Sequence, residues 1–192
     1  MPKDAETTSP PPALFAPQVR LDGEVNDDML RAFKNALQAS EDGPDPLVVE
    51  LTTTGGDADT GRRIADDLRL FRERTGRRPL FFGKGVVYSA GVTIMSGFER
   101  QDRWLSRDTS LLIHSRSINL TINLDGVLAR ERRKLEMVIE QIDEGLRLQA
   151  QGFRDLISGS DVSEAELAEK VETNWYLSAD EALARRLVAG VV

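Results

Sequence analysis

The chain has 192 residues, of which 40% are hydrophobic and 30% charged, and its formal net charge is −7. This composition is typical of a globular domain, and its acidity disfavours a nucleic-acid-binding surface. The sequence contains no cysteine and one histidine, which excludes disulfides, a cysteine nucleophile and a multi-histidine metal site. We therefore expect neither a metal nor another cofactor.

The N-terminal segment, residues 1–18, is rich in proline, threonine and acidic residues and is predicted to be flexible. Residues 19–192 are predicted to form one domain. The first residues lack the apolar core of a secretory signal, and no apolar run approaches the roughly 20 residues of a membrane helix. We therefore expect a cytoplasmic protein that does not use membranes or nucleic acids as partners.

Strands and helices are predicted to alternate through the first half of the chain. A short strand falls within residues 14–25, and an amphipathic helix follows over residues 26–40. The β-branched run at residues 47–54 is typical of a strand buried on both faces. A second helix, a short strand and a third helix are predicted at residues 58–74, 80–83 and 89–98.

The second half continues with a strand, a turn and a strand over residues 102–115. Residues 117–124 alternate apolar and polar side chains, which predicts a half-exposed strand. A helix over residues 125–157 would be roughly 45–50 Å long, more than the core of one domain needs, so it should project or pack on another subunit. Short helices follow. The alternation predicts an α/β fold of repeated βαβ units with a mostly parallel sheet and a long projecting helix.

Two predicted strands end in glycine-bearing turns that lead into helices, in "TTTGGDADTG" (52–61) and "GKGVVYSAG" (83–91). In open α/β sheets, ligands bind beyond the carboxyl ends of the strands. Backbone N–H groups at the start of a helix attract anions, and two of them converging on one point would form an oxyanion hole. The alternative interpretation is that both are simple tight turns.

Ser89 has two interpretations at this point. Serine is a common N-cap residue at the start of a helix. It is also a nucleophile when a base lies within hydrogen-bond reach. His114 is the single imidazole in the chain and ends the apolar strand "SLLIHS".

Four segments together resemble the ClpP serine peptidases, which have the ClpP/crotonase fold. They are the glycine-pair segment "TTTGGDADTG", the serine segment "GKGVVYSAGVTIM", the histidine segment "LLIHS" and "NWYLSADEAL", which is similar to the family's acid-bearing segment. The resemblance runs from about Val19 to the C-terminus, and the separation of Ser89 from His114 matches the family without a gap.

The resemblance implies that Ser89 is the nucleophile, His114 the general base, and the backbone N–H groups of Gly56 and Ala90 the oxyanion hole. The family's acid position falls on Asn174, so the implied triad is Ser-His-Asn. The implied activity is hydrolysis of peptide bonds through an acyl-enzyme. The implied partners are peptide or unfolded-protein substrates, further copies of the chain in a homo-oligomeric ring, and an ATP-driven unfoldase.

Asn174 leaves alternatives open. An asparagine oxygen orients an imidazole but supplies no charge, so the chain is alternatively a weak or inactive ClpP-like oligomeric subunit. Glu172 and Asp180 lie close enough in sequence to replace the acid. A crotonase-type enzyme acting on acyl-CoA thioesters would share the fold without a Ser-His pair. A Ser-Lys dyad would need Lys84 or Lys134 beside Ser89.

Overall fold

The computed structural model describes residues 9–43 and 45–192, and residues 1–8 of the segment predicted to be flexible lie outside this description. The elements follow one another as η1 (Pro12–Phe15), β1 (Val19–Asp22), α1 (Asp27–Ala39), β2 (Leu47–Thr53), α2 (Ala58–Thr75), β3 (Pro79–Tyr88), α3 (Ala90–Ser96), η2 (Arg100–Asp102), β4 (Arg103–Leu105), β5 (Ser110–Ile113), α4 (Leu128–Ile157), α5 (Glu164–Val171), β6 (Trp175–Ser178), α6 (Ala179–Ala184) and β7 (Gly190–Val191).

The sheet is parallel in the order β1-β2-β3-β4-β7, and β5 and β6 extend it beside β3. Only the β5–β6 pair is antiparallel among the described strands. The predicted α/β fold of βαβ units with a mostly parallel sheet is confirmed. Within the part of the chain that the structure describes, no helix is both long and apolar enough to cross a membrane.

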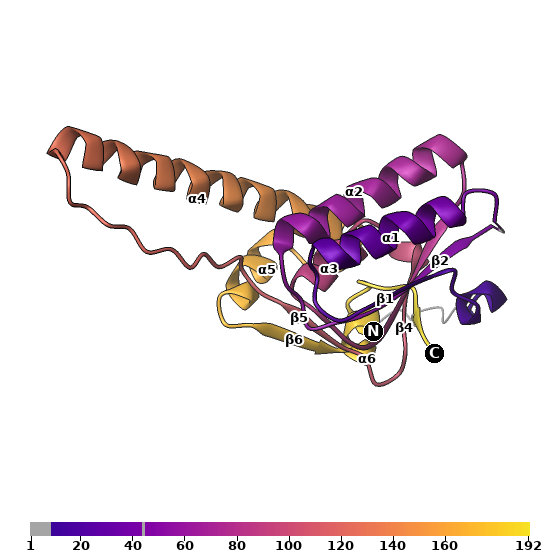
Figure 1. Cartoon of the computed structure of the whole chain (residues 1–192). Helices are drawn as coiled ribbons and strands as arrows, with labels where there is room; N and C mark the ends of the chain where they lie inside the picture. The colour runs from indigo at the N-terminus through magenta and orange to yellow at the C-terminus, as the bar shows by residue number, and fades with distance from the viewer. Residues whose placement is uncertain (1–8, 44) are drawn as a thin grey trace.

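Side chains of β2 alternate between the two faces of the sheet, and both faces are buried, as the β-branched run predicted. Leu47 and Val49 join the main core, which the helices α1 and α2 cover in Figure 1. Val48 points the other way, into a smaller cluster closed by Leu14 of η1 and Trp104 of β4. The end of the predicted flexible segment therefore includes a buried anchor, Leu14.

Strand β3 is longer than the predicted strand at residues 80–83, and it changes neighbours along its length. Its first half pairs with β4 through Phe81–Gly83, and its second half pairs with β5 through Val86–Tyr88. The register against β2 shifts between these halves, where Gly85 has a positive φ of 64°. The sequence signal was interrupted because glycine and a polar lysine stand between two apolar stretches, and the left-handed φ of Gly85 favours glycine at this shift.

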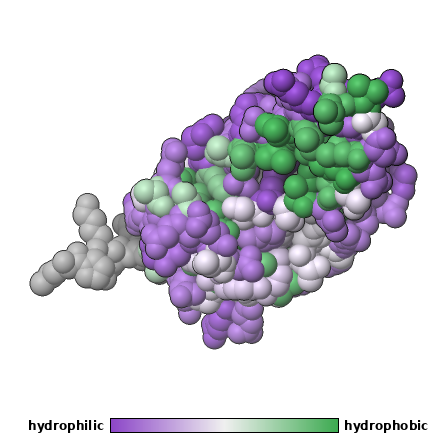
Figure 2. All heavy atoms as spheres, turned by 90° about the vertical axis from the view of Figure 1, so that its left-hand side faces the viewer, coloured by the Kyte–Doolittle hydropathy of each residue, from purple (hydrophilic) through white to green (hydrophobic). Residues whose placement is uncertain are grey.

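Helix α4 projects from the domain, as its length predicted. The segment between β5 and α4 runs outward to the far end of the helix, and α4 then leads the chain back to the domain (Figure 1). The prediction of a strand at residues 117–124 is wrong. This segment is extended in Figure 1, but it pairs with no other strand of the described chain. Its apolar side chains are half-exposed, and Figure 2 shows apolar residues gathered on the end of the molecule that carries α4. The exposed members of this apolar surface are Ile118, Leu120, Ile122, Leu124, Val127, Leu128, Leu135, Ile139, Ile142 and Leu146.

Candidate active site

A cavity of about 510 Å³ lies between the end of the sheet and the inner half of α4. Ser89 and His114 both line it, as do the proposed oxyanion-hole residues Gly56 and Ala90. The structure thus brings four of the five predicted site residues to one cavity. Its floor beside α4 is apolar and includes Phe153, and charged residues of α2 lie on its rim.

Ser89 occupies the N-cap position of α3 but does not behave as an N-cap. Its backbone has φ 55° and ψ −114°, whereas an N-cap residue normally has an extended backbone, and its side chain makes no capping hydrogen bond. A non-glycine residue in such a conformation costs on the order of 1–3 kcal/mol. The N–H of Ser89 donates to Leu112 O (2.8 Å), which places the serine directly beside the end of β5. The capping interpretation of Ser89 is therefore wrong.

The glycine pair lies against this serine. Gly55 has a φ of 103°, and a Cβ added to it would lie 2.8 Å from Ser89 Cβ and 3.4 Å from Ser89 Oγ. At Gly56, with φ 145°, an added Cβ would lie 2.4 Å from Val25 O. Both positions therefore require glycine, because the backbone passes closer to its neighbours than any side chain allows.

Gly56 and Ala90, whose backbone N–H groups were predicted to form an oxyanion hole, line the same cavity as Ser89. Val25 N–H donates to Gly55 O, and Asp57 N–H donates to Val25 O, so this bridge does not use the N–H of Gly56. Ala90 is the first residue of α3, where a backbone N–H has no acceptor within the helix. Two backbone N–H groups that converge on one point can bind a developing oxyanion.

His114 follows the last residue of β5, and its Nδ1 lies 2.7 Å from the carbonyl oxygen of Ser115. Asn174 immediately precedes β6, has a φ of 62° and is exposed. The β5–β6 register pairs Ile113 with Trp175, so continuing it by one residue sets Asn174 opposite His114. The predicted third residue is thus near the site, but the contact of Nδ1 in this structure is with Ser115.

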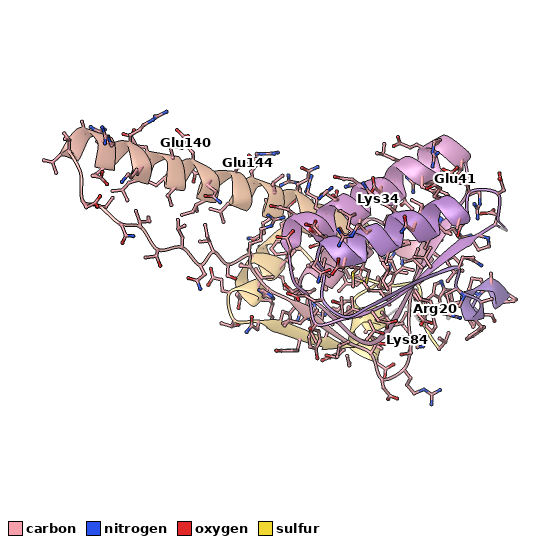
Figure 3. All side chains as sticks on the ribbon, viewed as in Figure 1. Arg20, Lys34, Glu41, Lys84, Glu140 and Glu144 are labelled. Atoms are coloured by element: carbon pink, nitrogen blue, oxygen red, sulfur yellow. The ribbon has the colours of Figure 1, made fainter. Side chains whose placement is uncertain are left out.

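The other candidates for the acid and the base lie elsewhere. Glu172 caps the end of α5 and Asp180 lies in the first turn of α6, and neither lines the cavity. Lys84 is on the bend of β3 beside the sheet (Figure 3), with its ammonium 3.3 Å from Glu50. Lys134 is on the outer part of α4 and pairs with Glu131 at 2.9 Å. Among the described residues, no lysine lines the cavity.

Sequence reasoning missed three polar residues of this site, Asp59, Arg116 and Gln149. Arg116 lines the cavity and donates from its guanidinium to Asp59 of α2 (2.8 Å), and its backbone N–H donates to Gln149 Oε1 of α4 (2.6 Å). Gln149 could have been found from the sequence. It lies three residues after Leu146 and four before Phe153, so it interrupts an apolar helical stripe with an amide.

Asp57, on the rim of the cavity, has a lowered pKa. Hydrogen bonds from the side chain and backbone of Thr60 hold the pKa of Asp57 below its ordinary value, and the nearby charge of Arg116 lowers this pKa further. Asp57 thus stays ionised at the N-terminus of α2, where the helix dipole favours an anion. Within the described residues, no cluster of three or more acidic or histidine side chains is arranged to hold a metal ion.

Serine hydrolases place a serine on a strained strand-to-helix turn, and here such a serine shares a cavity with a histidine. The model of the Clp protease family matches residues 13–192, and the chain belongs to this family. The family is one of serine peptidases, so the resemblance drawn from the four segments is confirmed. The match gives no support to the crotonase-type alternative.

Curated proteins similar to the chain are also Clp protease subunits, at low sequence identity. The chain is 24% identical over 184 residues to ATP-dependent Clp protease proteolytic subunit 2 of Treponema pallidum, covering 91% of this chain and 81% of that protein. It is 22% identical over 181 residues to the subunit 2 of Pseudomonas aeruginosa, covering 94% and 83%. A solved structure of an Asn-to-Asp variant of ClpP1 from Listeria monocytogenes has a similar fold, with a TM-score of 0.71 at 21% identity, covering 91% of this chain and 90% of that one.

Proposed function

We propose that the chain is a serine endopeptidase subunit in which Ser89 is the nucleophile and His114 the general base. One observation carries the proposal: Ser89 is held in a strained backbone conformation, and its hydroxyl is not used to cap α3. Backbone strain at a residue whose side chain has no structural role is typical of functional sites. The contact of Gly55 with Ser89 and the shared cavity with His114 support it.

The reaction follows from these groups. His114 Nε2 takes the hydroxyl proton while Ser89 Oγ bonds to the peptide carbonyl carbon, and the N–H groups of Gly56 and Ala90 bind the oxyanion. The imidazolium then protonates the departing amine as the C–N bond breaks, which leaves an acyl-enzyme. Water, deprotonated by the same imidazole, attacks the ester, and the acid product leaves as the proton returns to Ser89.

Asn174 is the proposed third member of the triad. Its amide oxygen can accept the Nδ1–H of His114 from across the β5–β6 pair, but it carries no charge to stabilise the imidazolium. We expect turnover below that of a Ser-His-Asp site. A catalytically weak or inactive subunit is the second candidate function, and the exposure of Asn174 favours it.

The substrates we propose are peptides or unfolded proteins, handled inside a homo-oligomeric ring in the cytoplasm. The apolar surface on α4 and residues 117–128 supports assembly, because large exposed apolar surfaces mark protein interfaces. The names of the curated relatives, ATP-dependent Clp protease proteolytic subunits, support an ATP-driven unfoldase as partner.

Labelling with a fluorophosphonate tests the nucleophile. Covalent labelling is expected in the assembled wild-type protein and is expected to disappear in Ser89→Ala. Ser96→Ala is a matched control, because Ser96 lies at the other end of α3 and does not line the cavity. Absence of labelling in every oligomeric state would favour the inactive subunit, and sedimentation of the same samples reports whether they assembled.

A further inference from the structure

The contact between His114 and Ser115 determines which ring nitrogen carries the hydrogen. Nδ1 lies 2.7 Å from the carbonyl oxygen of Ser115, and a carbonyl oxygen only accepts hydrogen bonds. Nδ1 must therefore be the protonated nitrogen, and in the neutral ring Nε2 is left with a free lone pair. A general base facing a serine hydroxyl needs this tautomer.

The carbonyl that accepts this hydrogen bond is held in place from its other side. The C=O of Ser115 and the N–H of Arg116 belong to one planar peptide group. That N–H donates to Gln149 Oε1 at 2.6 Å, so rotating the carbonyl away from His114 would break the bond to Gln149. A donated N–H also strengthens the carbonyl at the opposite end of the group as an acceptor, because hydrogen bonds in a chain polarise one another.

Gln149 is itself well fixed. It lies half-buried on α4 in the wall of the cavity. The base of α4 is tied to the core by Arg103, whose guanidinium donates to the carbonyl oxygens of Leu156 (2.7 Å) and Asp155 (3.2 Å). On the other side of the peptide, the guanidinium of Arg116 is bound to Asp59 of α2. The peptide between Ser115 and Arg116 thus connects α4 to α2 next to the imidazole.

We infer that Gln149 is a positioning residue, which sets the tautomer of His114 through the peptide group between Ser115 and Arg116. This inference rests on the proposed function, in which His114 is the base. In this conformation the carbonyl of Ser115, and not the side chain of Asn174, orients the imidazole of His114. Any movement of α4 that withdraws Gln149 releases the carbonyl and with it the imidazole.

The single histidine makes the tautomer directly measurable, because ¹⁵N-histidine labelling gives signals from His114 alone. Long-range ¹H–¹⁵N NMR of the wild-type protein, at a pH where the ring is neutral, should show hydrogen on Nδ1. Gln149→Leu should shift the population toward hydrogen on Nε2 and slow fluorophosphonate labelling of Ser89 about tenfold, the effect of losing one hydrogen bond that orients the base.

Two variants separate positioning from a general packing effect. Gln149→Glu keeps an acceptor for the Arg116 N–H and should retain the wild-type tautomer. Gln151→Leu removes an amide from the same helix, but this amide binds Arg62 (2.9 Å) and does not touch the His114 segment, so the tautomer should not change. Circular dichroism confirms that each variant is folded.

The inference is overturned if the wild-type ring carries its hydrogen on Nε2, or if folded Gln149→Leu keeps the wild-type tautomer. If Gln149→Leu does not fold, the wild-type and Gln149→Glu spectra still decide, because hydrogen on Nε2 in either contradicts the inference. Failure of the proposed function has a different signature. In that case Ser89 is never labelled, whichever tautomer the ring adopts.

Discussion

Gly55 packs so closely on Ser89 that a single methyl group would not fit between them, since an added Cβ would lie 2.8 Å from Ser89 Cβ. The glycine is also in a left-handed conformation, with φ 103°, that disfavours any side chain. This contact joins the turn after β2 to the turn after β3. It brings together a glycine pair and a serine that are far apart in sequence.

Gly55→Ala is expected to abolish fluorophosphonate labelling of Ser89, with a loss of about 100-fold or more, because the serine or the turn must move by roughly an ångström. Gly76→Ala is the matched control. Gly76 also has a positive φ (67°), but nothing lies within 4 Å of an added Cβ. This control should lose on the order of 1 kcal/mol of stability with unchanged labelling. Equal labelling in both variants would contradict the proposed contact.

Asn174→Asp is expected to raise peptidase turnover at least tenfold. A carboxylate opposite His114 can accept Nδ1–H and stabilise the imidazolium, and the reverse exchange in a chymotrypsin-like triad costs roughly 10⁴ in rate. Aspartate tolerates the left-handed backbone at this position, where φ is 62°. The measurement is kcat on a fluorogenic peptide. Asn35→Asp, an exposed change on α1, controls for the added charge. If the Asn174→Asp protein assembles without faster turnover, Asn174 is not the third member of the triad.

Asp57 is expected to make the free energy of unfolding decrease at acidic pH. Its pKa is lower in the folded protein than its ordinary value of 3.8, chiefly through hydrogen bonds from Thr60. A depressed pKa stabilises the fold above the ordinary value, and this stabilisation is lost as the pH falls through the folded-state pKa. Asp57→Asn should therefore flatten the decline of stability below about pH 4. Urea unfolding midpoints at pH 3 and pH 6 check this, and parallel declines in both proteins would count against it.

Arg103 is 2% exposed, and its guanidinium donates to backbone carbonyls of Phe98, Asp155, Leu156 and Leu187. Burial lowers the pKa of Arg103 to about 10, but the group stays protonated at neutral pH. Arg103→Met leaves buried carbonyls without donors, which should cost about 3 kcal/mol or more in the free energy of unfolding.

Denaturant unfolding measures this loss, and Arg132→Met provides the comparison. Arg132 is an exposed arginine of α4 that pairs with Glu136 at 3.0 Å, so its removal should change stability by no more than about 0.5 kcal/mol. A similar small loss for Arg103→Met would mean that the carbonyls find other donors.

Much of this protein follows from local pattern. The amphipathic stripe of α1, the buried run of β2, the long helix α4 and the glycine turns are short-range signals, because helix and strand periodicity depend on neighbouring residues. The positions of Ser89 and His114 at strand ends follow from the same signals, since parallel strands end at one edge of the sheet.

Only the tertiary structure decided the rest. The bend of β3 at Gly85, the missing strand at residues 117–124 and the bond from Arg116 to Gln149 all depend on which distant segment lies alongside. Alternating side chains allow a strand, but its hydrogen bonds need a neighbouring strand that no local pattern supplies. The tautomer of His114 likewise depends on a peptide held by a residue 35 positions away, because a hydrogen bond requires proximity in space and not in sequence.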